Sequence, residues 1–184
     1  FFSIQDVVRT PSLREWVASK ADVFEIVRTQ TKERFEIRSL KNTQREEEFA
    51  IRALQGQSRG IVEEEEIYEE FTPDHPDWMP FAFHGTWGAA VSGIVKEGLK
   101  AGADLRGKRN RDHVMAALRV DPNSEVSGIR TGTTTVVSID LAELRKTLAL
   151  EGLKVYITPA KAIVCKKVPT NALIRVWNLR AGEV

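Results

Sequence analysis

The spacing of apolar residues changes twice along the chain, and these changes limit the folds that are open to it. Over residues 3–30 apolar residues recur every three or four positions, which is typical of helices. Over residues 33–54 they alternate with polar residues, which is typical of strands. From residue 81 onward, short segments rich in β-branched residues are interrupted by two helical patterns. We therefore expect an α+β protein rather than a doubly wound sheet.

The first 30 residues predict three short helices. Ser3 and Ser19 precede helical patterns and are residues that cap helices well, and Pro11 suits the first position of a helix between them. In the third helix a stripe of apolar side chains is expected to face the core, made of Val23, Phe24, Ile26 and Val27.

Two alternating segments, 33–39 and 48–54, predict a β-ribbon after the helices. Helices followed by a ribbon are the winged-helix arrangement, so on fold analogy we expect a nucleic-acid-binding lobe over residues 1–62. Glutamates and then closely spaced prolines follow, and we interpret residues 63–80 as a linker. Residues 81–184 are expected to form a second, α+β lobe.

Arg52 lies in the second alternating segment, and its side chain is expected on the face opposite to Phe49 and Ile51. The pattern alone favours an exposed strand arginine at this position.

Composition excludes several classes of protein. The single cysteine, Cys165, excludes an intramolecular disulfide, and with only three histidines in the chain we expect no metal site. No apolar segment is long enough to cross a bilayer, so we expect a soluble intracellular protein of the cytoplasm, the nucleus or both. The fingerprints of the Rossmann fold and of the P-loop are also missing from the sequence.

The charges are segregated, although the formal net charge is only +1. Residues 61–70 are strongly acidic and residues 105–114 are strongly basic. The basic segment is the one expected to meet a phosphate, and a solvated surface explains either segment equally well.

A His-Gly-Thr triplet, residues 84–86, stands between a predicted strand and a predicted helix. The imidazole and the hydroxyl can hydrogen-bond to sugar hydroxyls or an amide, and the glycine lets a ligand approach the backbone. Taken alone, the triplet favours a plainer interpretation, in which Thr86 caps the helix and His84 completes the strand.

Two later segments carry arginines suited to phosphate. Arg109, Arg111 and His113 precede one predicted strand, and Ser127 and Arg130 lie in a loop before another. Guanidinium groups bind phosphate oxygens in a bidentate manner. Each segment by itself is equally compatible with an ordinary loop.

Six segments in order resemble the NAD-dependent RNA 2′-phosphotransferases, which remove the splice-junction 2′-phosphate from tRNA. "KERFEI" is similar to the family's K-x-R-F-E-I/L, "IRALQGQS" to its I-R-A-N-Q-G-H-S, and "FHGT" to its H-G-T. "IVKEGL", "RDHVMAA" and "VSGIR" are similar to its I-x-x-x-G-L, R-x-H-V/I-H-x-A and I-S-G-x-R. Each motif alone is weak, whereas six in the same order and with similar spacing are a strong resemblance.

The resemblance implies a winged-helix-like lobe for RNA, here without its first helix, and an ADP-ribosyltransferase-like lobe that binds NAD as co-substrate. It also implies two chemical steps. The RNA 2′-phosphate attacks the anomeric carbon of the nicotinamide riboside and expels nicotinamide. A ribose hydroxyl then attacks the phosphate, which releases ADP-ribose cyclic phosphate and RNA with a 2′-hydroxyl. The implied partner is tRNA or another RNA with an internal 2′-phosphate, with no membrane and no obligatory protein partner.

Carried over residue by residue, the resemblance assigns roles. Arg52 and Arg130 are the catalytic candidates, because chemistry between phosphate groups requires fixed cations more than a strong base. The expected RNA contacts are Lys32, Arg34 and Gln55. The expected NAD-binding residues are His84, Gly85, Thr86, Gly98, Leu99, Arg111, His113, Met115, Ser127 and Gly128.

The chain also departs from the family pattern. The family's adjacent catalytic Arg-His pair would precede Phe1, so we expect little activity from the chain as given. Met115 replaces a histidine that lines the nicotinamide pocket in related transferases, Gln57 replaces the histidine of Q-G-H-S, and Leu54 replaces the asparagine before it. Two alternatives stay open: a catalytically silent member that binds RNA or ADP-ribose, and a nucleic-acid adaptor whose second lobe only mediates contacts.

Overall fold

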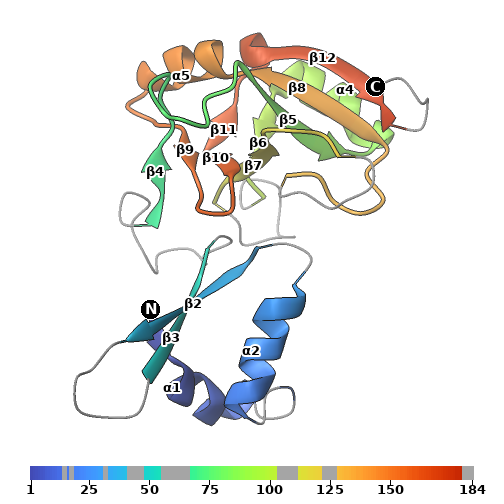
Figure 1. Cartoon of the computed structure of the whole chain (residues 1–184). Coiled ribbons are helices and arrows are strands. Elements are labelled where there is room, and N and C mark those ends of the chain that lie inside the picture. Colours follow the sequence, from blue (N-terminus) through green and yellow to red (C-terminus); the bar gives the residue numbers. More distant parts are fainter. Residues whose placement is uncertain are drawn as a thin grey trace. The chain divides into compact units, whose positions relative to one another are not determined.

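The chain divides into two compact units, Phe1–Gly56 and Gln57–Val184, each with its own sheet and helices (Figure 1). The mixture of helices with antiparallel sheets confirms the predicted α+β class. The computed structural model describes residues 1–13, 16, 19–30, 33–40, 48–54, 67–102, 112–121 and 128–179.

The first unit contains an antiparallel sheet of strand order β1-β3-β2 and short helices. Its elements are β1 (Phe2–Ser3), α1 (Ile4–Arg9), the 3-10 helix η1 (Pro11–Leu13), α2 (Lys20–Thr29), β2 (Phe35–Leu40) and β3 (Glu48–Ala53). The predicted ribbon is confirmed as β2 and β3, but it is joined by a third strand, β1. Two residues are too few to show an alternating pattern, so β1 cannot be predicted from periodicity. The helix expected from Pro11 is a single 3-10 turn within the described residues.

Both predicted helix caps of the first unit are confirmed. The Ser3 hydroxyl accepts a hydrogen bond from the amide of Gln5 at 3.2 Å. Ser19 and Asp22 form a capping box, in which the Ser19 hydroxyl accepts from the Asp22 amide and the Asp22 carboxylate accepts from the Ser19 amide. These contacts join residues two or three positions apart, which is why the sequence alone predicts them.

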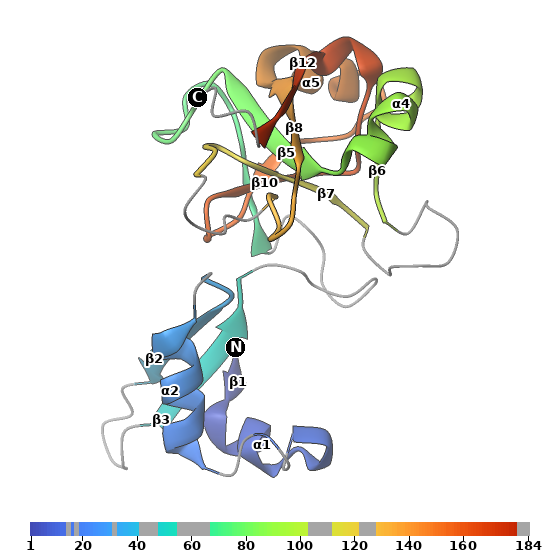
Figure 2. The ribbon, with the colours of Figure 1, turned by 90° about the vertical axis from the view of Figure 1, so that its right-hand side faces the viewer.

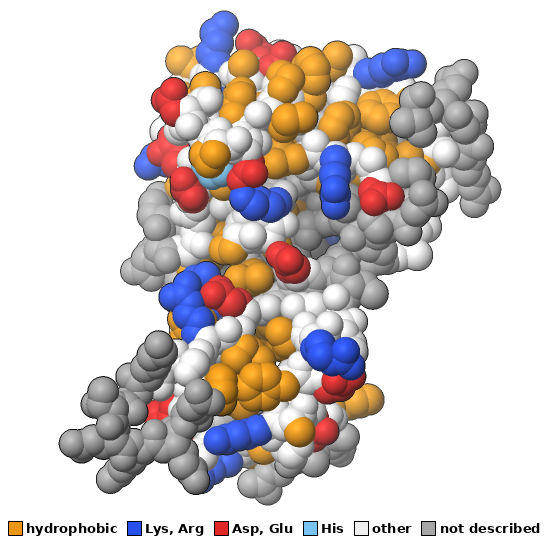
Figure 3. All heavy atoms as spheres, in the orientation of Figure 1, with side chains coloured by type: hydrophobic (Ala, Val, Ile, Leu, Met, Phe, Trp, Pro, Cys, Tyr) orange, Lys and Arg blue, Asp and Glu red, His pale blue; other side chains and the backbone are white. Residues whose placement is uncertain are grey.

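The core of the first unit is small. Ile4 and Val23 are buried at its centre, whereas Phe24 and Ile26 of the predicted stripe are exposed. The Phe24 ring packs edge-on against Phe49, with centroids 4.9 Å apart, and apolar side chains remain visible between α2 and the sheet (Figure 3). The predicted stripe is therefore wrong in part, because a small unit has too few residues to cover every apolar side chain.

The second unit is built on an antiparallel sheet of strand order β12-β8-β5-β7-β10-β9-β4, with β6 and β11 forming a separate pair. Its strands are β4 (Glu69–Glu70), β5 (Phe81–Thr86), β6 (Leu99–Lys100), β7 (Val114–Ala117), β8 (Thr135–Asp140), β9 (Tyr156–Ile157), β10 (Ala162–Cys165), β11 (Lys167–Val168) and β12 (Leu173–Asn178). Its helices are α4 (Gly88–Glu97), α5 (Leu141–Ala149) and the 3-10 helix η2 (Thr170–Ala172). Helix α5 packs on β8 and η2, and α4 packs on η2 and β12 (Figures 1 and 2).

The core of the second unit is extensive, because helix and strands both contribute fully buried side chains. Asp140 caps α5 by accepting a hydrogen bond from the Glu143 amide at 2.9 Å. Leu141, Leu144 and Leu148 follow at helical spacing and are buried against the sheet. None of the helices in the described part of the chain is long and apolar enough to cross a membrane.

The segment interpreted as a linker, 63–80, contributes to the second unit over its described part, 67–80. Glu69–Glu70 forms strand β4, which pairs with β9. Phe71 is fully buried in the main core, and its amide donates to the carbonyl of Val155 at 2.8 Å. This differs from the expected linker, because one buried phenylalanine among acidic residues and prolines is enough to bind the segment to the core.

Candidate functional site

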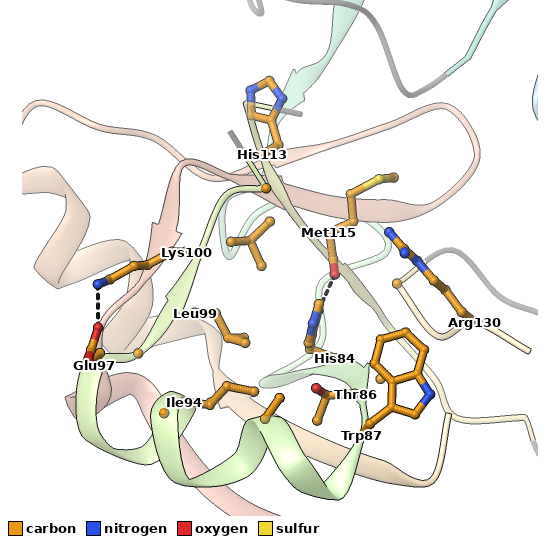
Figure 4. A pocket seen from close by; sticks show the side chains of 17 residues that line it. His84, Thr86, Trp87, Ile94, Glu97, Leu99, Lys100, His113, Met115 and Arg130 are labelled. Atoms are coloured by element: carbon orange, nitrogen blue, oxygen red, sulfur yellow. Dashed lines mark hydrogen bonds and ion pairs between the residues drawn. The ribbon is translucent and has the colours of Figure 1, made fainter. Parts of the chain in front are cut away.

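A cavity of about 400 Å³ lies in the second unit, lined by residues of β5, α4, β6 and β7 (Figure 4). This volume falls within the range of small-molecule sites, roughly 300–1,000 Å³. The cavity brings together every predicted NAD-binding residue that the structure describes: His84, Gly85, Thr86, Gly98, Leu99, His113, Met115 and Gly128. These residues come from segments far apart in the sequence, so the tertiary fold assembles them.

The remaining predicted residues fall into three groups. Arg130 lines the same cavity, whereas Arg52 lies on β3 of the first unit and Arg34 is exposed just before β2. The residues Lys32, Gln55, Gln57, Arg111 and Ser127 lie outside the described residues.

His84 projects from β5, and its Nδ1 lies 2.8 Å from the main-chain carbonyl oxygen of Met115 on β7. A carbonyl oxygen can only accept, so Nδ1 donates this hydrogen bond and carries the ring proton. Burial lowers the pKa of His84 below its usual value of 6.5, although the bond to Met115 opposes the change. The ring is therefore neutral at neutral pH, with Nε2 as a hydrogen-bond acceptor for a hydroxyl or an amide.

Two glycines let the backbone segments around the cavity approach closely. The Gly85 amide donates to the Gly128 carbonyl at 2.9 Å, and a Cβ at Gly85 would come within 2.9 Å of the Ile129 Cα. Gly128 has a φ of +96°, and a Cβ there would lie 2.6 Å from the carbonyl carbon of Ala116. These contacts place the segment that carries Arg130 against β5 and β7.

A short turn holds the backbone of Arg130 at the cavity. The Arg130 amide donates to the Thr133 hydroxyl at 3.2 Å, and the Thr133 amide donates to the Arg130 carbonyl at 3.0 Å. In the view of Figure 4, Arg130 and Trp87 lie on one side of the cavity and Glu97 and Lys100 on the other. The cavity therefore offers a cationic side chain on a held backbone turn together with a neutral imidazole, which suits a ligand with phosphate and hydroxyl groups.

The comparison with known families agrees with this chemistry. The family model described as "RNA 2'-phosphotransferase, Tpt1 / KptA family" matches residues 1–167. The chain belongs to this family. A comparison with curated proteins finds no match. The resemblance drawn from the six motifs is thus confirmed, and the class of activity is that of an RNA 2′-phosphotransferase.

The plainer interpretation of Thr86 in this phosphotransferase is wrong. Thr86 ends β5 and is buried, and its carbonyl accepts from the Thr134 amide at 3.1 Å. Trp87 occupies the N-cap position of α4 and makes no side-chain capping bond. The start of α4 therefore presents backbone amides without a side-chain cap beside the cavity, an arrangement that favours anionic or polar groups.

Sequence reasoning did not find the α4 residues that line the cavity. Trp87, Val91, Ile94 and Val95 recur at helical spacing, but only Ile94 of these is buried. The cavity is instead lined by Trp87, Ala90, Gly93, Ile94 and Glu97. A signal was present, because the small residues Ala90 and Gly93 lie one helical turn apart and leave room beside the helix.

At the end of α4, Glu97 and Lys100 form an ion pair of 2.6 Å that lines the cavity. The hydrogen bond and the charge of Lys100 lower the pKa of Glu97, so its carboxylate stays ionised at neutral pH. Among the described residues, no group of three or more His, Cys, Asp or Glu side chains is placed to hold a metal ion.

Arg52 of this phosphotransferase is neither fully exposed nor alone. It lies directly opposite Glu36 in the β2–β3 register, and its guanidinium Nη2 is 2.6 Å from Glu36 Oε2. About one third of the Arg52 side chain is exposed, at 32%. The expectation of an exposed strand arginine is therefore corrected to a half-buried, ion-paired one.

Proposed function

We propose that this protein removes an internal 2′-phosphate from RNA by transferring it to the ADP-ribose part of NAD, with nicotinamide and ADP-ribose cyclic phosphate as the other products. The observation that carries the proposal is the cavity of the second unit. It gathers the described NAD-binding candidates and Arg130 around one space of about 400 Å³. Family membership supplies the class of reaction.

The groups around the cavity fit the polar parts of NAD. His84 Nε2 would accept a hydrogen bond from a ribose hydroxyl or from the nicotinamide amide, because Nδ1 is engaged by the Met115 carbonyl. The amides at the start of α4 would bind a pyrophosphate oxygen. When bound, NAD supplies an anomeric carbon with nicotinamide as its leaving group.

Arg130 and Arg52 would provide the positive charge that phosphate chemistry requires. Phosphoryl and phosphate-ester transition states spread negative charge over several oxygens, and fixed cations stabilise that charge without reorganising. We assign both arginines to the RNA 2′-phosphate, whose negative charge they would stabilise during its transfer.

The first unit would serve as a winged-helix-like RNA-binding lobe, with contacts from Lys32, Arg34 and Gln55, and the second as an ADP-ribosyltransferase-like lobe. The exposed position of Arg34 beside β2 supports the first assignment, because exposed cations on a sheet can bind RNA phosphates.

The departure at Met115 is compatible with activity. Its hydrogen bond with His84 is made by the main-chain carbonyl, which any residue at that position supplies. Leu54 is buried, so an apolar side chain suits that position as well. No observation therefore favours a silent member or a simple adaptor over the phosphotransferase.

The test is an assay of the full-length protein on an oligonucleotide with one internal 2′-phosphate, with and without NAD. We expect the phosphate to be lost only with NAD, and Arg52→Ala and Arg130→Ala each to lower kcat by about 100-fold or more, as removal of a charge-stabilising group does. Arg28→Ala is the matched control, because Arg28 is an exposed arginine paired with Glu25 on α2. Phosphate removal without NAD, or full activity in both arginine variants, would refute the proposal.

A further inference from the structure

One carboxylate in the first unit binds two arginines. Glu36 on β2 accepts hydrogen bonds at Oε2 from Arg52 Nε, at 2.7 Å, and from Arg52 Nη2, at 2.6 Å. Its other oxygen, Oε1, accepts from Arg38 Nε at 2.9 Å. Because each oxygen serves a different arginine, Glu36 holds the two guanidinium groups next to each other.

An aromatic ring adds a second constraint on both arginines. The guanidinium carbon of Arg52 lies 4.8 Å from the centroid of the Phe1 ring, and that of Arg38 lies 5.0 Å from it. Strand β1 brings Phe1 to this position by pairing Phe2 with Ile51 on β3. Contacts with a carboxylate and with an aromatic face restrict the rotamers of both arginines.

The electrostatic balance of this cluster is positive. Partial burial raises the pKa of Glu36, but the hydrogen bonds and charges of Arg38 and Arg52 outweigh this and lower it below the usual value. The carboxylate is thus ionised at neutral pH, and the three side chains together carry one net positive charge. Glu36 occupies the Nε–Nη2 edge of Arg52, so the Nη1 side of the guanidinium is directed away from the carboxylate.

A purely stabilising ion pair of the same unit looks different. Arg28 and Glu25 on α2 form a pair at 2.7 Å, with 73% and 58% of their side chains exposed. Among the described residues no second arginine and no aromatic ring joins them. Such exposed pairs contribute only about 0–1 kcal/mol to stability.

The substrate of the proposed function has a matching feature. An internal 2′-phosphate shares its ribose with the 3′-phosphodiester, so the RNA presents two neighbouring anionic groups there. RNA without the modification presents a single phosphate per ribose. Two arginines held side by side are complementary to the modified ribose, because each can bind one phosphate.

We propose that Glu36 is a positioning residue that joins Arg38 to Arg52, so that Arg52 meets the 2′-phosphate and Arg38 meets the adjacent backbone phosphate. The inference rests on the proposed function. It adds Glu36, which orients the arginines, and Arg38, which contacts the RNA, to the residues that bind RNA. The feature that this unit recognises is then the pair of neighbouring phosphates.

The test compares Glu36→Gln, Glu36→Asp and Arg38→Ala with the wild-type full-length protein. We expect Glu36→Gln to lower kcat about tenfold with an unchanged KM for NAD, and Glu36→Asp to restore part of the loss, because a misdirected cation stabilises the transition state less well. Arg38→Ala should raise the KM for RNA about tenfold and reduce the slope of log affinity against log salt by about 1, as loss of one phosphate contact does.

A binding measurement tests the inference without turnover. RNA with an internal 2′-phosphate and the same RNA without it are titrated against wild type and Arg38→Ala, with Glu25→Gln and Arg28→Ala as matched controls. We expect Arg38→Ala to reduce the preference for the modified RNA and the controls to keep it. Thermal unfolding verifies that each variant is folded.

The outcomes separate the two proposals. If wild type does not remove the phosphate, the proposed function fails. The preference for RNA with the 2′-phosphate in the binding measurement then tests the role of the paired arginines by itself. If Arg52→Ala is inactive while Glu36→Gln keeps the wild-type kcat, the positioning role is overturned. An equal loss of binding to both RNAs in Arg38→Ala would likewise overturn recognition of the phosphate pair.

Discussion

The two units of this RNA 2′-phosphotransferase differ in how much apolar surface they bury. The first centres its core on Ile4 and Val23 and keeps large apolar side chains such as Phe24 exposed. The second buries helix, strand and loop residues in one continuous cluster that includes Phe71 and Leu148.

This difference separates two ways of building a functional site. A large core supports a sheet and helices rigidly enough to leave a cavity of about 400 Å³ between them. The first unit instead orders charged groups on its strands, where Glu36 and Arg52 face each other across the β2–β3 pair.

The largest effect is expected in the core of the second unit. Phe71→Ala should lower the free energy of unfolding by about 3–5 kcal/mol, because the ring is fully buried and its removal leaves a void. Denaturant unfolding measures the change. Leu150→Ala is the control, since this side chain is 85% exposed and should alter stability by no more than about 0.5 kcal/mol. A loss below about 1 kcal/mol for Phe71→Ala would show that residues 67–80 do not depend on the core.

A smaller and more local effect is expected in the first unit. Ile4→Ala should cost about 2 kcal/mol, at the lower end for such changes, because a small core collapses more readily around the missing atoms. Hydrogen exchange should accelerate for amides of α1 and β3 and stay unchanged for amides of β8. Equal acceleration in both units would contradict the division into two cores.

Gly128→Ala tests the close packing behind the cavity. We expect a loss of about 1–3 kcal/mol, because the residue has a positive φ and its Cβ would meet the Ala116 backbone. Binding of ADP-ribose should weaken as well. Gly132→Ala is the matched control, because Gly132 also has a positive φ, +78°, but open space around it. Equal effects of the two substitutions on ADP-ribose binding would show that the contact with β7 is irrelevant to the cavity.

The smallest effect concerns pH. The pKa of His84 is lowered in the folded protein, so the unfolded chain takes up a proton at this residue before the folded one does. Its contribution to stability is present above the unfolded value of about 6.5 and is lost as pH falls below it. His84→Gln should therefore flatten the fall in unfolding free energy between neutral pH and pH 5. Identical pH profiles of the two proteins would contradict burial of a neutral imidazole.

Features that depend on neighbouring residues were predictable from the sequence. The caps at Ser3 and Ser19 are confirmed, since each requires only a few consecutive residues of the right type. The three residues 84–86 line one cavity, and the sequence indicates a ligand-binding role for them only through the order of the six motifs.

Features that depend on residues far apart in the sequence were not predictable from it. Strand β1 exists because Phe2 pairs with Ile51, and β4 exists because Glu69 pairs with Ile157. Neither segment has a periodic pattern of its own, so each acquires its conformation from the strand beside it.

By itself, the amino-acid sequence determined the fold class, the helix caps, the family and the residue types that reach the candidate site. These depend on local periodicity and on the order of short motifs. Only the tertiary structure decided which nitrogen of His84 carries the proton, that Gly128 must approach Ala116, and that Glu36 binds two arginines. Each of these is a contact between strands or loops that the chain brings together only after folding, and no spacing along the sequence encodes its distance or direction.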